Sequence, residues 1–138
     1  MKRIAFIGCS KRKKSSPCIA EKLYQGELFK KSLQYCQQEK FDEIYILSAK
    51  YGVLSLDEMV SPYEKTLNTF SKSERIEWSD MVKAQLIERK IVGEYYFFCG
   101  NNYHEYFVGN KPLLKLSLGF QLQWFSSRLN NKPKGFNL

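Results

Sequence analysis

The sequence predicts an α/β protein with three layers, α/β/α, in which helices cover both faces of a small, mostly parallel sheet of three or four strands. Short apolar runs alternate with longer segments of helical periodicity, the order that produces right-handed β-α-β crossovers. Each apolar run also ends in small or polar residues. Because the carboxyl ends of parallel strands meet at one edge of a sheet, the turns that follow them should open together there.

Three strands are predicted from runs of apolar, β-branched and aromatic residues. They cover residues 4–7, 43–47 and 94–99, and residues 111–114 are a candidate fourth strand. Runs as continuous as these are typical of strands that are buried on both faces, which is the situation in a parallel sheet between helices.

Three helices are predicted between and after these strands. Apolar residues recur at helical spacing over 26–39 and over 118–129, where the aromatic stripe is interpreted as core packing. The longest helix, about 72–91, begins with Ser-Lys-Ser-Glu at Ser71, which is a capping box. A short amphipathic segment follows the third strand.

Two connecting segments are interpreted as loops. Residues 15–25 are polar and contain Pro17. Residues 53–67 contain Pro62 and show no sustained period, but their interleaved apolar residues predict a long ordered loop. Loops of this length in a compact domain are usually functional or disordered.

Composition limits the classes of function. The 138 residues, 43% of them hydrophobic, suit one domain, 1–138, with a polar tail at about 130–138. The net charge of +8 favours a polyanionic partner, nucleic acid or nucleotide. No apolar run approaches the roughly 20 residues of a membrane helix, and no signal peptide is evident. We therefore expect a cytoplasmic protein with no membrane association; the oligomeric state is left open.

The turns after the three strands carry the side chains of a predicted binding site. The first combines small donors with four consecutive cations, from Lys11 to Lys14. Such turns offer cations and backbone donors for phosphate, amides that can read a base edge, and aromatic faces for stacking. The alternative is that the basic run is solvated surface. The ligand-binding candidates are Cys9, Ser10, Lys11, Lys13, Tyr24, Ser48, Lys50, Tyr51, Gly52, Tyr63, Gly100, Asn101 and Asn102.

Other chemistries have less support in the sequence. One histidine excludes a multi-histidine metal site, and the four cysteines lack the paired spacing of a zinc site, so no metal and no cofactor are expected. Neither GxGxxG nor a Walker lysine is present. Cys9 is either a nucleophile activated by neighbouring cations or a small buried strand-end residue. Acid or base groups would come from Asp57, Glu58, Glu64 or His104, each of which also fits an ordinary structural or surface role.

A family resemblance is carried by the motifs CSKRK, LYQGELFKK, ILSAKYGVLSLDEMVSPYEKTL, CGNNYHEYF and PLLKLSLGFQLQWF. Together they resemble a DUF6884-like family of short, uncharacterised bacterial and phage domains. The SAKYG…PY segment is remotely similar to the base-recognising domain of archaeosine synthase and, through it, to the uracil-DNA-glycosylase-like α/β fold. The peroxide-stress proteins of the YaaA type, linked to DNA binding, are a similar family. These resemblances imply a pocket for a nucleobase or modified nucleoside.

The chain departs from the glycosylase pattern at two places. A glycosylase of that fold carries an aspartate in its water-activating loop and a histidine that stabilises the leaving base. Here the first turn reads Cys9-Ser10-Lys11, and the one histidine, His104, belongs to the third turn.

We therefore expect a nucleobase- or nucleotide-recognising enzyme that acts on an N-glycosidic bond, by hydrolysis or base-exchange-type glycosyl transfer, in nucleic acid or in a nucleotide. One alternative is a non-catalytic protein that sequesters a nucleotide or coats nucleic acid, for example in a phage. Another is an adaptor with a basic face that binds no nucleotide. The assigned roles are phosphate binding for Lys11, Lys13 and Lys50, base recognition for Asn101 and Asn102, stacking for Tyr51 or Tyr63, and water activation for Glu64 or Asp57.

Overall fold

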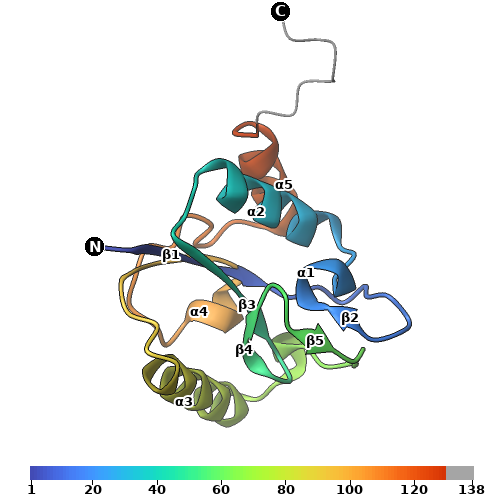
Figure 1. The fold of residues 1–138 in the computed structure, drawn as a ribbon, viewed down its shortest axis with the longest axis vertical. Helices are drawn as coiled ribbons and strands as arrows, with labels where there is room; N and C mark the ends of the chain where they lie inside the picture. The colour runs from blue at the N-terminus through green and yellow to red at the C-terminus, as the bar shows by residue number, and fades with distance from the viewer. Residues whose placement is uncertain (130–138) are drawn as a thin grey trace, which may run out of the picture.

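Helices cover both faces of a central four-stranded sheet with the strand order β4-β3-β1-β6 (Figure 1). The computed structural model describes residues 1–129. The predicted polar tail, 130–138, lies outside the described residues. The predicted fold class, α/β with a small and mostly parallel sheet, is confirmed.

Strand β1 (Arg3–Gly8) lies in the middle of the sheet because its side chains are apolar on both faces. Ile4 to Ile7 have no exposed surface. β1 pairs in parallel with β3 (Glu43–Ser48) on one side and with β6 (Glu94–Phe98) on the other. The three predicted strands are therefore confirmed, and all three end at the same edge of the sheet, here termed the carboxyl edge.

The fourth strand is not the one that the sequence predicts. β4 (Gly52–Ser55) returns antiparallel to β3, where a long loop was expected, and residues 111–114 form a turn. Four residues are too few to show a period. The sequence carries one signal for this hairpin, Gly52. Three-residue hairpin loops place a glycine in the left-handed region, and Gly52, which follows the connection 49–51, has φ +74°.

A side chain closes the outer edge of β4. Gln85 of α3 (Lys72–Glu88) accepts a hydrogen bond from the amide of Val53 at 2.8 Å and donates one to the carbonyl of Tyr51 at 3.0 Å. These are the bonds that a further strand would make. A Cβ on Gly52 would collide with the Gln85 amide, so glycine, which also suits the positive φ, lets this side chain approach the strand. The sheet therefore ends at β4.

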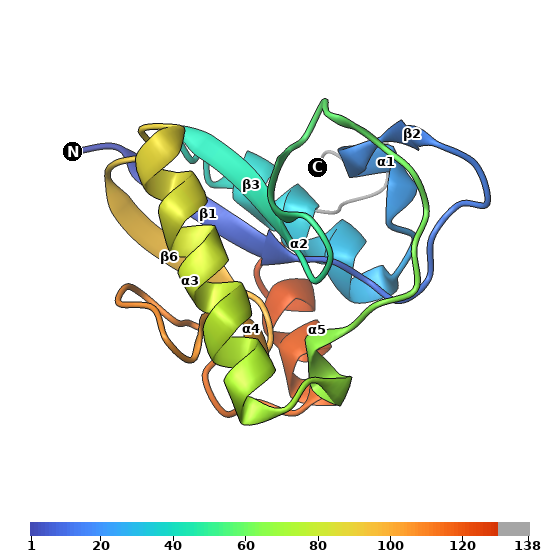
Figure 2. The same ribbon diagram turned by 90° about the horizontal axis from the view of Figure 1, so that it is seen from below.

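Two helical layers enclose the sheet, as Figures 1 and 2 show. The side chains of β1 alternate between the layers: Ala5 and Ile7 pack in the core with α2 (Glu27–Gln38) and α5 (Leu118–Ser126), whereas Ile4 and Phe6 pack with α3. The short helix α4 (Asn101–His104) lies on the α3 side. The three predicted long helices are confirmed, and α3 begins with the predicted capping box at Ser71.

Short elements occupy the segments that the sequence left as loops. β2 (Cys18–Ile19) and α1 (Ala20–Leu23) lie within 15–25, and β2 pairs antiparallel with β5 (Met59–Val60). A 3-10 turn, η1 (Leu67–Thr69), precedes α3. Elements of two to four residues carry no periodicity of their own, because tertiary contacts form them. No helix within residues 1–129 is long and apolar enough to cross a membrane.

Candidate functional site at the carboxyl edge

Hydroxyl groups and a thiol from five separate segments gather at the carboxyl edge. Ser48 Oγ, at the end of β3, lies 2.7 Å from Tyr63 Oη, which lies 2.7 Å from Tyr24 Oη. Cys9, directly after β1, has its Sγ 3.4 Å from Tyr103 Oη of α4. These five residues are termed the edge cluster. The first two turns thus meet as the sequence predicts, with the third represented by Tyr103.

Ser48 is the most firmly held member of the edge cluster. Its Oγ also accepts hydrogen bonds from the amides of Lys50 at 3.2 Å and Tyr51 at 3.0 Å, which is the usual way a serine shapes a turn. Its carbonyl accepts a hydrogen bond from the indole of Trp78 at 3.0 Å. The turn that follows β3 is therefore fixed from both the sheet and α3.

The tyrosines of the edge cluster are closed to water. Tyr24 is 1% exposed, Tyr63 9% and Tyr103 8%. Burial raises the pKa of Tyr24 to about 12. The pKa values of Tyr63 and Tyr103 are also raised; burial is the larger cause, and the neighbouring Cys9 is the next. The hydroxyl groups are therefore neutral at physiological pH and act as hydrogen-bond donors and acceptors rather than as bases.

Cations lie beside the edge cluster. Lys13 Nζ lies 4.4 Å from the centroid of the Tyr63 ring, and Lys50 Nζ lies 5.2 Å from that of Tyr51. The two rings meet edge to face at 5.5 Å. Burial lowers the pKa of Lys13, while the neighbouring Cys9 and Glu64 act in the opposite direction. The basic rim is defined as Lys11, Arg12, Lys13, Lys14 and Lys50.

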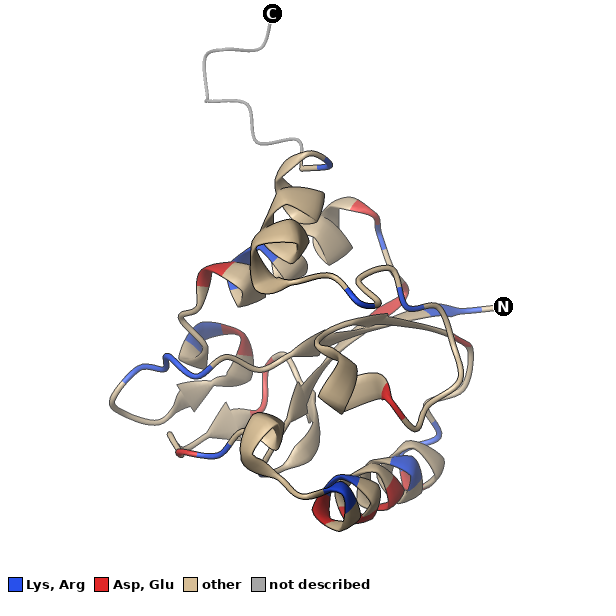
Figure 3. Cartoon of the chain, turned by 180° about the vertical axis from the view of Figure 1, so that it is seen from behind, with Lys and Arg blue, Asp and Glu red and all other residues tan. Residues whose placement is uncertain are grey.

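Within residues 1–129, no cation of the basic rim forms an ion pair with a carboxylate. The ion pairs found within residues 1–129 involve other cations, and the Lys13 ammonium donates instead to the carbonyl of Lys11 at 3.2 Å. Figure 3 shows the run of Lys and Arg on the loop between β1 and β2, a loop without Asp or Glu. The positive charge of the rim is thus available to a ligand.

The loop of the basic rim has a defined shape. Ser10 Oγ accepts from the amide of Gly26 at 3.2 Å and donates to the carbonyl of Arg12 at 2.8 Å. The Lys14 amide donates to the carbonyl of Leu23 at 2.9 Å. A Cβ on Gly26 would lie 2.7 Å from that of Ser10, so this glycine permits the close approach. The backbone holds the cations in place before any ligand binds.

The predicted asparagines of the third turn make contacts elsewhere. Asn101 Oδ1 accepts from the amide of Lys115 at 3.4 Å, and Asn102 Nδ2 donates to Asn68 Oδ1 at 3.0 Å. Gly100 has open space where a side chain would project. Base recognition by the asparagines stays a prediction that would require these hydrogen bonds to rearrange.

Three of the acid or base candidates, Asp57, Glu64 and His104, lie in different surroundings. Glu64 is exposed and follows Tyr63 in the chain, and its charge acts to raise the pKa of Lys13. Asp57 is exposed in the turn after β4. Because β4 runs away from the carboxyl edge, Asp57 lies at the end of β4 that is distant from this edge. His104 is 1% exposed, and neither ring nitrogen has a hydrogen-bond partner within residues 1–129. Burial and the charge of Lys111 lower the pKa of His104.

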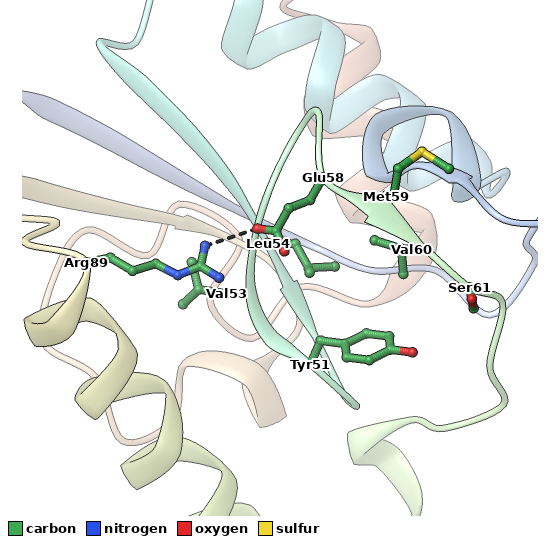
Figure 4. A pocket seen from close by; sticks show the side chains of 8 residues that line it. All are labelled: Tyr51, Val53, Leu54, Glu58, Met59, Val60, Ser61 and Arg89. Carbon is green, nitrogen blue, oxygen red and sulfur yellow. Dashed lines mark hydrogen bonds and ion pairs between the residues drawn. The ribbon is translucent and has the colours of Figure 1, made fainter.

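A shallow pocket of about 410 Å³ lies beside β4 (Figure 4). Its polar wall is the ion pair between Glu58 Oε1 and Arg89 Nη1 at 3.1 Å. Tyr51 belongs both to this pocket and to the ring pair under the basic rim. Arg89 was not predicted, since a contact 31 residues from Glu58 leaves no local pattern. The pocket is lined by Tyr51, Val53, Leu54, Glu58, Met59, Val60, Ser61 and Arg89.

The model of a family described as "Family of unknown function (DUF6884)" matches residues 4–127. The chain belongs to this family. The match takes in all of the sheet except Arg3, together with the edge cluster and the basic rim, and it confirms the family resemblance drawn from the motifs. A search of curated proteins and a search of solved structures each gave no match. Within residues 1–129 of this DUF6884 chain, no group of three or more His, Cys, Asp or Glu side chains could hold a metal ion.

Proposed function

We propose that this protein recognises a nucleotide, free or within a nucleic-acid strand, at the carboxyl edge of its sheet. The observation that carries the proposal is the placement of Lys13 and Lys50 over the adjoining rings of Tyr63 and Tyr51, with neither ammonium in an ion pair within residues 1–129. Such a site offers charge for a phosphate, and the partly exposed ring of Tyr51 offers an aromatic face for a base. The net charge of +8 favours the same partner.

The proposal extends to cleavage of an N-glycosidic bond. In this proposal Glu64, the exposed carboxylate that follows Tyr63 in the chain, takes a proton from water. Water then adds to C1′ while the C1′–N bond breaks, the bonding pair leaves with the base nitrogen, and solvent supplies the proton that the base gains. Base exchange differs only in the nucleophile, a second base in place of water.

Binding without turnover is the second candidate function. Two predicted acid or base residues lie away from the proposed site, because Asp57 is at the distant end of β4 and His104 is buried in the core. Glu64, which is exposed, is then the predicted acid or base nearest to Tyr63 in the chain, and this scarcity favours binding without turnover. A protein that sequesters a nucleotide or coats nucleic acid needs the rim and the aromatic rings, and it needs no base.

The location of the protein is part of the same proposal. All four cysteines are free thiols, which suits a reducing compartment such as the cytoplasm, where nucleotides are abundant.

Removal of the rim cations tests binding. Lys13→Ala and Lys50→Ala should each weaken the binding of a fluorescent nucleotide or oligonucleotide roughly tenfold at low salt, since a hydrogen bond to a charged group is lost. Lys83→Ala, which removes the same charge from the exposed side of α3, is the matched control. Equal affinity for all three variants and the parent would remove the proposal.

Two further measurements separate the forms of the proposal. Strand binding should lose affinity with salt at a log–log slope of about −0.7 to −0.9 per neutralised phosphate, whereas a mononucleotide should lose less. Mass spectrometry after incubation with nucleosides, nucleotides and oligonucleotides should detect a released base if the protein is an enzyme. Glu64→Gln should then abolish release while leaving binding intact, and binding with no released base identifies a binder.

A further inference from the structure

The pocket beside β4 holds polar groups that the phosphate site does not use. We propose that this pocket binds the base of the nucleotide, and that Glu58 and Arg89 select bases that carry an exocyclic amino group. This inference rests on the proposed function, because the basic rim is taken to hold the phosphate. It adds a specificity-determining pair of residues and a class of preferred ligand.

Tyr51 joins the pocket to the basic rim. Its ring lines the pocket, and the ammonium of its neighbour Lys50 lies 5.2 Å from the ring centroid. Figure 4 shows the side chain extending from the start of β4 toward Ser61, below Val60. A base stacked on this ring would therefore have a cation within reach of its phosphate. The volume of about 410 Å³ falls within the range of small-molecule sites.

Glu58 presents a fixed acceptor to the pocket. Its Oε1 accepts from the amide of Ser55 at 3.0 Å and from Arg89 Nη1 at 3.1 Å. Its carbonyl accepts from the amide of Ala20 at 2.8 Å, so the main chain is held as well. The second oxygen, Oε2, has no hydrogen-bond partner within residues 1–129, nor have Nε and Nη2 of Arg89. The pocket wall thus offers an acceptor, Glu58 Oε2, next to the N–H donors of Arg89.

An amino-substituted base presents the complementary pattern. In adenine and cytosine the exocyclic amino group donates a hydrogen bond, and the adjacent ring nitrogen accepts one. The amino group can therefore donate to Glu58 Oε2 while the ring nitrogen accepts from Arg89. Hypoxanthine and uracil, in the same position, place a carbonyl oxygen against the carboxylate and a protonated ring nitrogen against the arginine; they pair with the two side chains only after a shift that lets the ring N–H donate to Glu58 and the oxygen accept from Arg89. Because the phosphate at the basic rim and the stacked ring of Tyr51 fix the position of the base, this shift is disfavoured, and the site should prefer AMP to IMP and CMP to UMP.

Titration of these matched pairs by calorimetry tests the inference. The parent protein should bind AMP about tenfold more tightly than IMP, which corresponds to one hydrogen bond with a charged acceptor. Glu58→Gln should reduce the preference to about twofold or less, because an amide can donate to the carbonyl of hypoxanthine. Glu77→Gln, an exposed carboxylate on α3, should keep the parent's preference.

The outcomes separate this inference from the proposed function. Equal binding of AMP and IMP by the parent, with affinity still lost in Lys13→Ala, would overturn the base pocket and leave the phosphate site standing. Absence of nucleotide binding would overturn both. A measurement on the parent alone guards against misfolding of Glu58→Gln: AMP should shift the methyl NMR signals of Val53, Leu54 and Val60, and shifts confined to other methyl groups would also overturn the pocket.

Discussion

The hydroxyl groups of Ser48 and Tyr63 share a hydrogen bond of 2.7 Å that ties the end of β3 to the segment after β5. The same serine oxygen accepts from the amides of Lys50 and Tyr51. One hydroxyl group therefore shapes the turn that carries Lys50 and also holds the ring beneath Lys13. This single contact therefore links the turn that carries Lys50 to the ring that lies under Lys13.

Tyr63→Phe should destabilise the fold by about 1–3 kcal/mol, because Ser48 and the buried Tyr24 each lose a hydrogen-bond partner. Urea unfolding measures the change. Tyr96→Phe, which removes only an exposed hydrogen bond to Glu94 at 2.9 Å, serves as control. A loss no larger than that of the control would show that the buried hydroxyl chain contributes nothing to stability.

Gln85→Ala should expose the outer edge of β4. The amide of Val53 and the carbonyl of Tyr51 lose their partner, and water replaces it at a cost of about 1–2 kcal/mol. Hydrogen exchange at the Val53 amide should accelerate more than exchange in β1. Unchanged exchange at Val53 would mean that the glutamine does not close the strand.

Gly52→Ala should be destabilising for two separable reasons. The residue has φ +74°, which costs a side chain about 1–2 kcal/mol, and its Cβ would meet the Gln85 amide. In the double variant with Gln85→Ala the collision disappears and the backbone strain stays. We therefore expect a double variant more stable than the sum of the single changes predicts, and strict additivity in urea unfolding would argue against the collision.

Stability should fall with acidification through His104. Burial lowers its pKa below the ordinary value of about 6.5, so the unfolded chain binds a proton more readily than the folded one. The contribution is complete above pH 6.5 and is lost progressively as the pH falls below it. Lys111 disfavours the charged ring further, and Glu105 partly offsets this.

Because the chain has one histidine, His104→Leu isolates this effect. The variant should show a flatter dependence of unfolding free energy on pH between 7 and 5 than the parent. Identical slopes for the two proteins would indicate that the ring is solvated in solution.

Thiol labelling should divide the cysteines into two pairs. Cys36 and Cys99 are buried, and burial raises the pKa of each thiol, whereas Cys9 and Cys18 are partly exposed. Two thiols should react with a small disulfide reagent before unfolding and four after it. A bound nucleotide should slow the labelling of Cys9, and an unchanged labelling rate for Cys9 would place the ligand away from the edge cluster.

The parts of the fold that the sequence predicted are those whose residues carry their own signal. Strands β1, β3 and β6 are buried on both faces, so their apolar runs are continuous. Strand β4 was missed because it is four residues long and is held by β3 and by the Gln85 side chain, neither of which leaves a pattern in GVLS. The meeting of the turns at one edge follows from parallel strands and could be predicted.

The detail of the candidate site was less accessible. Ser48, Tyr24 and Tyr63 meet as expected, but the local sequence does not determine which way a side chain points at the start of a helix. Asn101 and Asn102 therefore face other partners, and Tyr103, the next residue, contacts Cys9. Arg89 reaches Glu58 across a long sequence interval, a contact that only the folded chain defines.

The central position of β1 has a consequence for biosynthesis. This strand leaves the ribosome before the others of the sheet, yet one of its two neighbours, β6 (Glu94–Phe98), is translated much later. Until then the nascent chain presents Phe6 and Ile7 beside an unpaired row of backbone groups, the kind of surface that chaperones bind and that aggregates form from. Slow translation between β3 and β6 should therefore lower the yield of native protein more than slow translation after β6.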